Sequence, residues 1–366
     1  IWIDQTIQRT IAHIQSGGGF DVSLQVTIPN EWEKIAPINI GVTAGIETTK
    51  VAPLWLQKGN EIVDRIITIS NHSVDSYKNT VAFATNNQTG EQFEYRLQTP
   101  IDYVSYPVKS CENIDLNLNL KNKFNFLTVA QFGHRKNIPN TIKWFIEEFH
   151  DDDVGLIVKT NMAKNCFMDR EIVISNMRNI TSQFPDRKCK VYLLHGDMTD
   201  EEIHSMYGHE KVSALLALPH AEGFGLPIFE AAYSGLPIVA TGWSGHLDFL
   251  VDEKGIEHFY NVSFDLQPIQ KEVVWENVLI QESMWAFPRE QSAKRQMRQC
   301  YNDIINNSQD TIAANSCEYA IELGERFAHT KMADKFVNLV CDGLGVGDTA
   351  QEIDEWINSL DIEEYD

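Results

Sequence analysis

The sequence has 366 residues and a mass of 41.7 kDa, which suits two domains of roughly 100–200 residues each. Its hydrophobic share of 43% and charged share of 22% are globular values and exclude a largely disordered chain. The 30 Lys and Arg against 52 Asp and Glu leave a net charge of −22, which repels nucleic-acid phosphates and acidic lipid headgroups. Nucleic acid is therefore disfavoured as a partner, and no apolar run approaches the roughly 18 residues of a membrane span.

The first hundred residues predict an α/β unit. Strands are expected at Val22–Ile28, Ile38–Val42 and Ile66–Ser70, with a helix through Leu54–Val63 and weaker strands at Phe93–Leu97 and Tyr103–Tyr106. The unit is short for a complete domain, and the chain opens on Ile1 rather than Met. We therefore expect residues 1–108 to form an N-terminal, acceptor-side Rossmann-like domain that is truncated at its start, followed by a linker over residues 109–122.

Residues 123–310 alternate strand and helix more clearly. Strands are predicted at 126–130, 154–158, 191–194, 212–218 and 238–241, and helices at 138–149, 172–184 and 228–234, with a further helix that starts at the capping box Thr199–Glu202. Such alternation is typical of parallel strand pairing in a doubly wound sheet. Residues 311–366 are predicted to form helices that pack back toward the first domain, followed by an acidic tail.

The segment His220–Glu230 carries the strongest chemical signal. It lies between a predicted strand and a short helix, and Gly223 and Gly225 allow the backbone to turn tightly beside a ligand. The first N–H groups of the helix that begins at Leu226 have no partners within that helix, so they favour an anion such as a diphosphate. Open α/β sheets bind ligands at this carboxyl end of their strands.

Two carboxylates flank this turn. Glu222 precedes it and Glu230 lies in the helix, eight positions later, and we expect both to face one crevice. Because a carboxylate can accept two hydroxyl donors at once, each could hold one sugar of a nucleotide sugar. The alternative interpretation is a solvated Glu222 and a Glu230 that only complements the helix dipole.

Three motifs of this region form a recognisable pattern. Glu222-Gly-Phe-Gly-Leu-Pro227, Glu230-Ala231 and Gly235-Leu-Pro-Ile-Val-Ala240 closely resemble the retaining glycosyltransferases of family 4. The resemblance implies the GT-B fold, in which two Rossmann-like doubly wound domains face each other across a cleft. It implies that Glu230 binds the donor ribose, that Glu222 contacts the donor sugar, and that the backbone of Gly223, Phe224, Gly225 and Leu226 holds the diphosphate.

The same resemblance predicts further site residues. Arg135 and Lys136, in the loop after the first strand of the donor domain, would neutralise the leaving diphosphate without a metal or other cofactor. Lys159 is expected at the crevice edge, His195 near the nucleobase, His220 beside a phosphate or sugar, and Glu47 on the acceptor side. Each has a simpler alternative, namely a solvated basic loop, a surface lysine, a buried structural histidine or an exposed carboxylate.

The expected reaction is transfer of a sugar from a nucleotide diphosphate-sugar to an acceptor hydroxyl with retention of configuration. The acceptor class stays open between a glycan, a lipid-linked molecule and a small molecule. Other possibilities are an epimerase or phosphorylase on the same fold, an inactive sugar-nucleotide-binding protein, and glycosylation of modified DNA bases, which the charge of −22 opposes. Asp151–Asp153 precedes a strand and is interpreted as an acidic turn rather than a metal site.

The six cysteines form no CxxC pair and have no zinc-like spacing with histidine. This pattern is typical of reduced thiols in a cytoplasmic protein, so the cytoplasm is the expected location.

Overall fold

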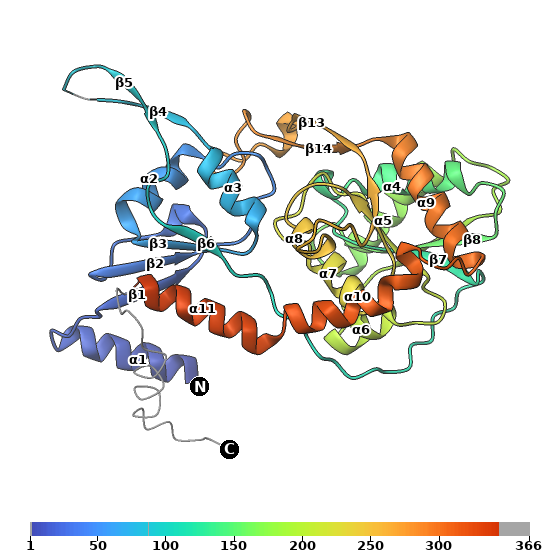
Figure 1. Cartoon of the computed structure of the whole chain (residues 1–366), viewed down its shortest axis with the longest axis horizontal. Coiled ribbons are helices and arrows are strands. Elements are labelled where there is room, and N and C mark those ends of the chain that lie inside the picture. Colours follow the sequence, from blue (N-terminus) through green and yellow to red (C-terminus); the bar gives the residue numbers. More distant parts are fainter. Residues whose placement is uncertain (1, 87, 344–366) are drawn as a thin grey trace.

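A parallel sheet of four strands forms the first domain within the described chain, which comprises residues 2–86 and 88–343 of the computed structural model (Figure 1). The strands are ordered β1 (Val22–Val26), β2 (Ile38–Val42), β3 (Arg65–Thr68) and β6 (Ile101–Tyr103). Helices α2 (Pro53–Ile62) and α3 (Asn71–Asn79) bury Trp55 and Tyr77 against Ile66 on one face. Since side chains alternate along a strand, Ile67 points to the opposite face, where it lines a cavity.

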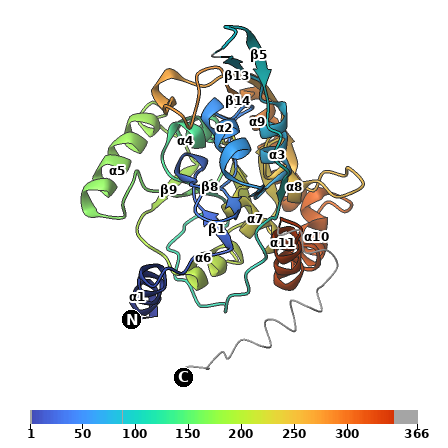
Figure 2. The ribbon, with the colours of Figure 1, turned by 90° about the vertical axis from the view of Figure 1, so that its left-hand side faces the viewer.

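Three elements of this domain were not predicted. Helix α1 (Trp2–Gln15) precedes the sheet, and none of its described residues is buried; it stands at the edge of the domain in Figure 2. A short 3-10 turn, η1 (Pro29–Glu31), follows β1. Strand β4 (Ala82–Thr85) pairs in an antiparallel hairpin with β5 (Gln92–Tyr95), which overlaps the predicted strand Phe93–Leu97, and this hairpin projects away from the rest of the molecule.

The second domain contains, in the described residues, a parallel sheet of six strands. In sheet order these are β12 (Tyr260–Val262), β11 (Ile238–Thr241), β10 (Ala214–Ala217), β7 (Phe124–Val129), β8 (Val154–Lys159) and β9 (Lys190–Leu194). The central pairing sets Phe126 of β7 beside Ala214 of β10 and beside Leu156 of β8. The order changes direction at β7, so β7 and β10 mark the switch point at which open α/β sheets bind ligands.

Helices cover both faces of this sheet. Helices α4 (Ile138–Glu148), α5 (Phe167–Thr181) and α9 (Glu290–Ile305) pack on the face of Phe126. Helices α6 (Asp200–Tyr207), α7 (Leu226–Tyr233), α8 (Leu247–Leu250) and α10 (Ile312–Arg326) pack on the face of Leu127. Neighbouring β7 residues therefore supply two separate cores, which confirms the prediction of a doubly wound sheet.

The two domains are joined by several segments. Residues 104–123 run between them without a helix or strand, and the backbone N–H of Val108 donates to Phe327 at 2.9 Å. Helix α10 packs against α7 of the second domain, whereas α11 (His329–Gly343) returns along β2 of the first (Figure 1). The predicted acidic tail over residues 348–366 lies outside the described residues.

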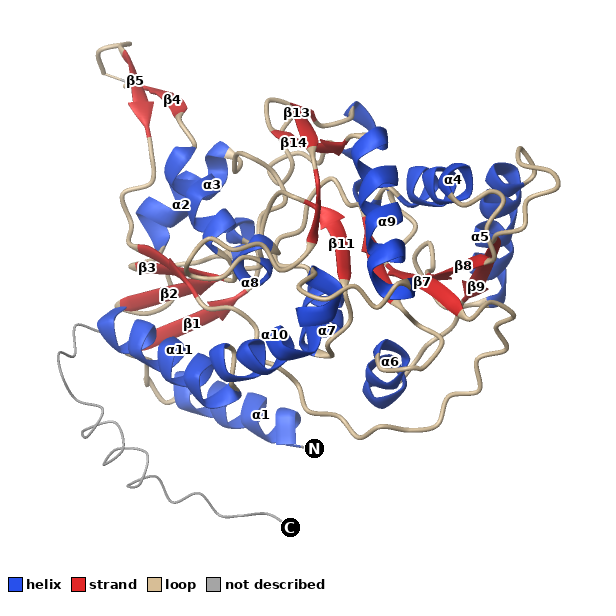
Figure 3. Ribbon diagram, turned by 45° about the vertical axis from the view of Figure 1, so that its right-hand side comes forward, coloured by secondary structure: helices blue, strands red, loops and turns tan. Residues whose placement is uncertain are grey.

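A hairpin of β13 (Phe264–Pro268) and β14 (Met284–Pro288), with the 3-10 turn η3 (Lys271–Val273) in its connection, forms another link (Figure 3). Two hydrogen bonds join its Met284 to Thr49 of the first domain, each at 3.0 Å. The Thr49 backbone N–H donates to the Met284 carbonyl, and the Met284 backbone N–H donates to Thr49 Oγ1. The sequence did not predict this hairpin. None of the helices in the described residues is long and apolar enough to cross a membrane.

Candidate active site at the domain boundary

The glycine turn after β10 lies where the two domains meet. Gly225 has a φ of +93° and opens α7, a backbone conformation that glycine adopts without strain. Gly223 packs against glycines from two other loops: a Cβ on Gly45 would lie 2.6 Å from the Gly223 backbone, and one on Gly245 would lie 2.0 Å from its carbonyl oxygen. Glycine at these positions therefore permits the loops after β2, β10 and β11 to touch.

A cluster of charges lies beside the turn. Arg135 and Lys136 lie in the 3-10 turn η2 (His134–Lys136) that follows β7. The Glu222 carboxylate forms ion pairs with Arg135 Nη1 at 3.0 Å and with Lys136 Nζ at 2.5 Å. Arg135 Nη2 also lies 3.4 Å from Glu47 Oε1 of the first domain. The structure therefore brings together four predicted site residues from both domains.

The electrostatics of this cluster follow from its burial. Only 10% of the Glu222 side chain is exposed, and burial would raise the pKa of Glu222, but Lys136 and Arg135 together hold it below its usual value. Burial would likewise lower the pKa of Arg135, yet Glu222 and Glu47 keep it above its usual value. The carboxylate and the guanidinium thus stay ionised, and each cation is already paired within the protein.

Glu230 lies in a different environment on α7. Its Oε2 accepts a hydrogen bond from the Tyr207 hydroxyl at 3.1 Å, and it borders a cavity of about 20 Å³ together with Lys109 and Tyr233. Burial raises the pKa of Glu230, and the hydrogen bond from Tyr207 offsets this only in part. The side-chain partner of this carboxyl group is therefore a neutral tyrosine hydroxyl and not a cation in an ion pair.

The structure does not bring Glu222 and Glu230 into one crevice. Glu222 borders a separate cavity, also of about 20 Å³, with Lys136 and Pro227. Glu222 precedes the glycine turn, whereas Glu230 is the fifth residue of α7 and faces α6, so the two carboxyl groups border different small cavities here. A ligand that contacts both must therefore extend around the turn. The expectation that both face one donor crevice stays a prediction.

The diphosphate-binding residues predicted at this turn are mostly covered. Gly223, Phe224 and Gly225 are buried, and Leu226 is 41% exposed. The Phe224 ring packs against Phe249 and against Tyr106 of the inter-domain segment, with ring centroids 5.0 and 5.3 Å apart. The side chain of Phe224 therefore belongs to the core, and binding of a diphosphate by the backbone of this turn stays a prediction.

The three remaining predicted donor contacts have partners inside the protein. Lys159 Nζ donates to the Gly196 carbonyl at 2.5 Å, and His195 Nε2 lies 2.9 Å from the buried Asp169. His220 is buried beside Trp285, with its Nδ1 at 2.7 Å from the Ala286 carbonyl oxygen. These contacts hold loops in place, and a direct contact of any of the three with a donor stays a prediction.

Sequence reasoning missed several residues of this region. Tyr207 holds Glu230 from 23 positions away, and Asp169 binds His195 as well as the backbone N–H groups of residues 162–164. Two buried polar atoms, Thr241 Oγ1 and His246 Nδ1, have no hydrogen-bond partner among the described residues. No spacing rule links such residues, because each lies on a different element. In the described part of the chain, no three His, Cys, Asp or Glu side chains are grouped to hold a metal ion.

Comparison with solved structures shows the class of fold. Sucrose-phosphate synthase from Thermosynechococcus elongatus is 11% identical, with 92% of this chain and 77% of its own covered at a TM-score of 0.59. A glycosyltransferase from Rickettsia africae is 12% identical, with 83% and 70% covered and a TM-score of 0.55. Anabaena HepE, solved in complex with UDP and glucose, is 15% identical, with 83% and 72% covered and a TM-score of 0.52. The chain thus has the GT-B fold, as predicted.

One segment carries a family match as well. Residues 188–261, from β9 to β12, match the family described as "Glycosyl transferases group 1". The segment contains the glycine turn, Glu222 and Glu230. No curated protein matches the chain significantly. The fold and this segment are thus both similar to those of glycosyltransferases.

Proposed function

We propose that the protein transfers a sugar from a nucleotide diphosphate-sugar to an acceptor hydroxyl with retention of configuration and without a metal ion. The observation that carries this proposal is the pairing of Arg135 and Lys136 with Glu222 beside the glycine turn, inside the segment that matches group 1 glycosyltransferases. Two partly buried cations beside the N-terminus of α7 suit a diphosphate leaving group.

The proposed step forms one bond and breaks one. The acceptor oxygen attacks the anomeric carbon from the face that the diphosphate leaves, and the bond from that carbon to the diphosphate breaks with its electron pair going to the diphosphate. A diphosphate oxygen takes the acceptor proton, so no side-chain nucleophile is needed. Arg135 and Lys136 stabilise the charge that develops on the departing group, and the protein orients both substrates.

Donor binding requires a rearrangement at the domain boundary. Gly45 touches the backbone of Gly223, so the loop after β2 must move before a diphosphate can reach this turn. The diphosphate would then replace Glu222 as the partner of Arg135 and Lys136. Glu222 would thereby be free to accept hydrogen bonds from the donor sugar, Glu230 would hold the ribose, and Glu47 would lie on the acceptor side.

A thermal-shift screen against UDP-, GDP- and ADP-sugars tests donor binding. A ligand at 100 times its Kd should add about 2.7 kcal/mol of apparent stability. The Anabaena neighbour was solved with UDP and glucose, so UDP-glucose is the first donor to try. If no nucleotide sugar raises the Tm while the folded protein melts normally, the proposal is wrong.

Product analysis then separates transfer from its alternatives. Turnover that needs an acceptor hydroxyl, gives an anomer of unchanged configuration by NMR and continues in EDTA supports retaining, metal-independent transfer. Turnover without an acceptor would indicate an epimerase, and turnover with inorganic phosphate a phosphorylase. We also propose that the enzyme works in the cytoplasm, where its six free cysteines, all within the described residues, would stay reduced.

A further inference from the structure

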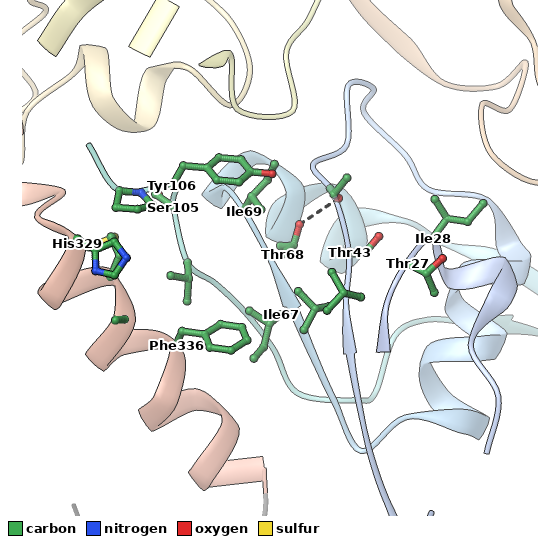
Figure 4. Close-up of a pocket in the computed structure, with 17 residues that line it drawn as sticks. Thr27, Ile28, Thr43, Ile67, Thr68, Ile69, Ser105, Tyr106, His329 and Phe336 are labelled. Carbon is green, nitrogen blue, oxygen red and sulfur yellow. Dashed lines mark hydrogen bonds between the residues drawn. The ribbon is translucent and has the colours of Figure 1, made fainter. Parts of the chain in front are cut away.

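A cavity of about 640 Å³ lies between the first domain and α11 (Figure 4). The carboxyl ends of all four strands of the first sheet reach it, at Thr27, Thr43, Thr68 and Ser105. Helix α11 supplies the opposite wall, with Phe336 facing Ile67 in Figure 4. This volume falls within the range of small-molecule sites, which span roughly 300–1,000 Å³.

The lining of this cavity is uncharged. None of the 17 described residues that border it is Asp, Glu, Lys or Arg, although the chain carries 82 such residues in all, 30 basic and 52 acidic. The polar groups are the hydroxyls of three threonines, one serine and Tyr106, together with His329. A phosphorylated ligand would need cationic partners here, so the lining selects an uncharged, mainly apolar molecule.

One hydroxyl of the lining is unpaired. Thr43 is 3% exposed, and its Oγ1 has no hydrogen-bond partner among the described residues. The neighbouring Thr68 Oγ1 donates to the Ala44 carbonyl at 3.4 Å, the dashed contact in Figure 4. A buried hydroxyl without a partner is costly, so this wall of the cavity holds one polar group that the described residues do not satisfy.

Two residues at one end of the cavity adjoin the glycine turn of the candidate active site. Tyr106 lines the cavity and packs edge-on against Phe224, with ring centroids 5.3 Å apart. Ala44 also lines it, and the next residue, Gly45, touches Gly223. One end of the cavity is therefore built by the same residues that meet the proposed diphosphate site.

We propose that this cavity binds the acceptor, and that the acceptor is an uncharged alcohol with a mainly apolar body rather than a sugar phosphate. This inference rests on the proposed transferase function. The apolar body lies against Met332 and Phe336 of α11, and the reacting hydroxyl lies at the Tyr106 and Ala44 end. The proposal gives α11 the role of an acceptor wall contributed from the far end of the chain.

Direct binding of 4-methylumbelliferone, an aromatic alcohol studied in its neutral form, tests the cavity without any donor. Fluorescence titration compares the wild type with Ala333→Trp, which places an indole at the cavity wall. The matched control is Asn338→Trp, an exposed α11 position that does not border the cavity. We expect Kd to rise about tenfold or more in Ala333→Trp, from lost apolar contact and occupied volume, and to stay within about twofold in Asn338→Trp.

Three results would overturn the inference. They are no binding to the wild type, equal loss of binding in both tryptophan variants, and displacement of the probe by glucose 6-phosphate. Helical circular dichroism of each variant shows that it is folded. Because UDP-sugar binding is measured separately by thermal shift, a donor response without probe binding rejects the acceptor class and leaves the transferase proposal standing. Probe binding without a donor response would show that the cavity binds an apolar alcohol, but it would reject the transferase proposal and with it the role of that alcohol as an acceptor.

Discussion

Glu222 and Glu230 are both largely buried carboxyl groups, but their surroundings shift their pKa values in opposite directions. Glu222 lies on a loop that faces η2, and two cations lower its pKa despite its burial. Glu230 lies on α7 facing α6, and burial raises its pKa although Tyr207 donates a hydrogen bond. The spacing of the two glutamates in the sequence does not distinguish their environments. The difference in pKa comes from the elements that pack against each residue.

This contrast assigns the two regions different chemistry. The Glu222 region holds paired opposite charges that a diphosphate can exchange, so it suits charge stabilisation. The Glu230 region holds a carboxylate among hydroxyl groups, so it suits recognition of a neutral diol. Variants that remove one kind of interaction but keep the other should therefore affect different kinetic constants.

The largest effect is expected for Arg135→Ala in the Glu222 region. Losing one charge-assisted contact to the leaving diphosphate should reduce kcat by about 10²–10³. Steady-state kinetics with the donor found by thermal shift measures it. Lys143→Ala is the matched control, because Lys143 is a half-exposed lysine in the same domain whose only described ion pair is with Glu147. Unchanged turnover in Arg135→Ala would show that the Glu222 region does not stabilise the leaving diphosphate.

Glu230→Ala should give the next largest effect, mainly on the donor KM. Loss of hydrogen bonds between a carboxylate and the ribose hydroxyls is expected to cost about 1.5–3 kcal/mol, or roughly 10–10² in kcat/KM. Glu230→Gln keeps an acceptor oxygen and should lose less. Wild-type turnover in Glu230→Ala would contradict the assignment of this residue to the donor site.

Much of the second domain follows from its sequence. The apolar runs at Phe126, Val154 and Ile238 and the capping box at Thr199 appear in the structure as β7, β8, β11 and the start of α6. These signals are local, since each depends on residues within one element. The position of Arg135 and Lys136 in the loop after the first strand of the second domain also agrees with the sequence, because η2 follows a strand whose position the pattern defined; their contact with a diphosphate stays a prediction.

The parts that failed depend on contacts between distant segments. The surroundings of Glu230 and of the glycine turn depend on such contacts: Tyr207 lies 23 positions from its partner Glu230, and Gly45 lies 178 positions from Gly223, which it packs against. The β13–β14 hairpin was missed because its exposed strand alternation is weak. Helix α1 was not predicted, although Ile3, Ile7, Ile11 and Ile14 recur at helical spacing. All four side chains are exposed, so in this structure their spacing does not correspond to a helix face that packs on the sheet.

Asp248 sharpens the comparison, because its environment resembles that of Glu230. Burial raises the pKa of Asp248 to about 6, while the backbone N–H of Asn71 across the domain boundary opposes this by donating at 2.7 Å. The unfolded side chain ionises near 3.9, so the wild type should lose stability as pH rises from about 4 to 6 and stay lower above that. Asp248→Asn keeps an acceptor oxygen but cannot ionise.

The measurement is the Tm of both proteins between pH 4 and 7.5. The Tm of Asp248→Asn minus that of the wild type should increase as pH rises across this range. The increase should correspond to roughly 1–2 kcal/mol of unfolding free energy after allowing for solvent screening. Asp303→Asn is a useful comparison, because that carboxylate also accepts a side-chain hydrogen bond, from Tyr260 at 2.8 Å, but lies away from the domain boundary. A difference in Tm that does not change with pH would show that Asp248 is ionised throughout.

The smallest effect is expected at Asp152, which tests whether an ion pair is enough to mark a site. Asp152 pairs with Arg298 at 2.8 Å and is 37% exposed, so its charge is largely screened. Asp152→Ala should cost at most about 1 kcal/mol of stability and change kcat/KM by less than about twofold. Arg298 keeps Glu148 as a partner at 2.6 Å, so the helix contact survives. A large loss of activity would instead mean that Asp151–Asp153 takes part in catalysis, and the contrast between paired charges at the glycine turn and those elsewhere would fail.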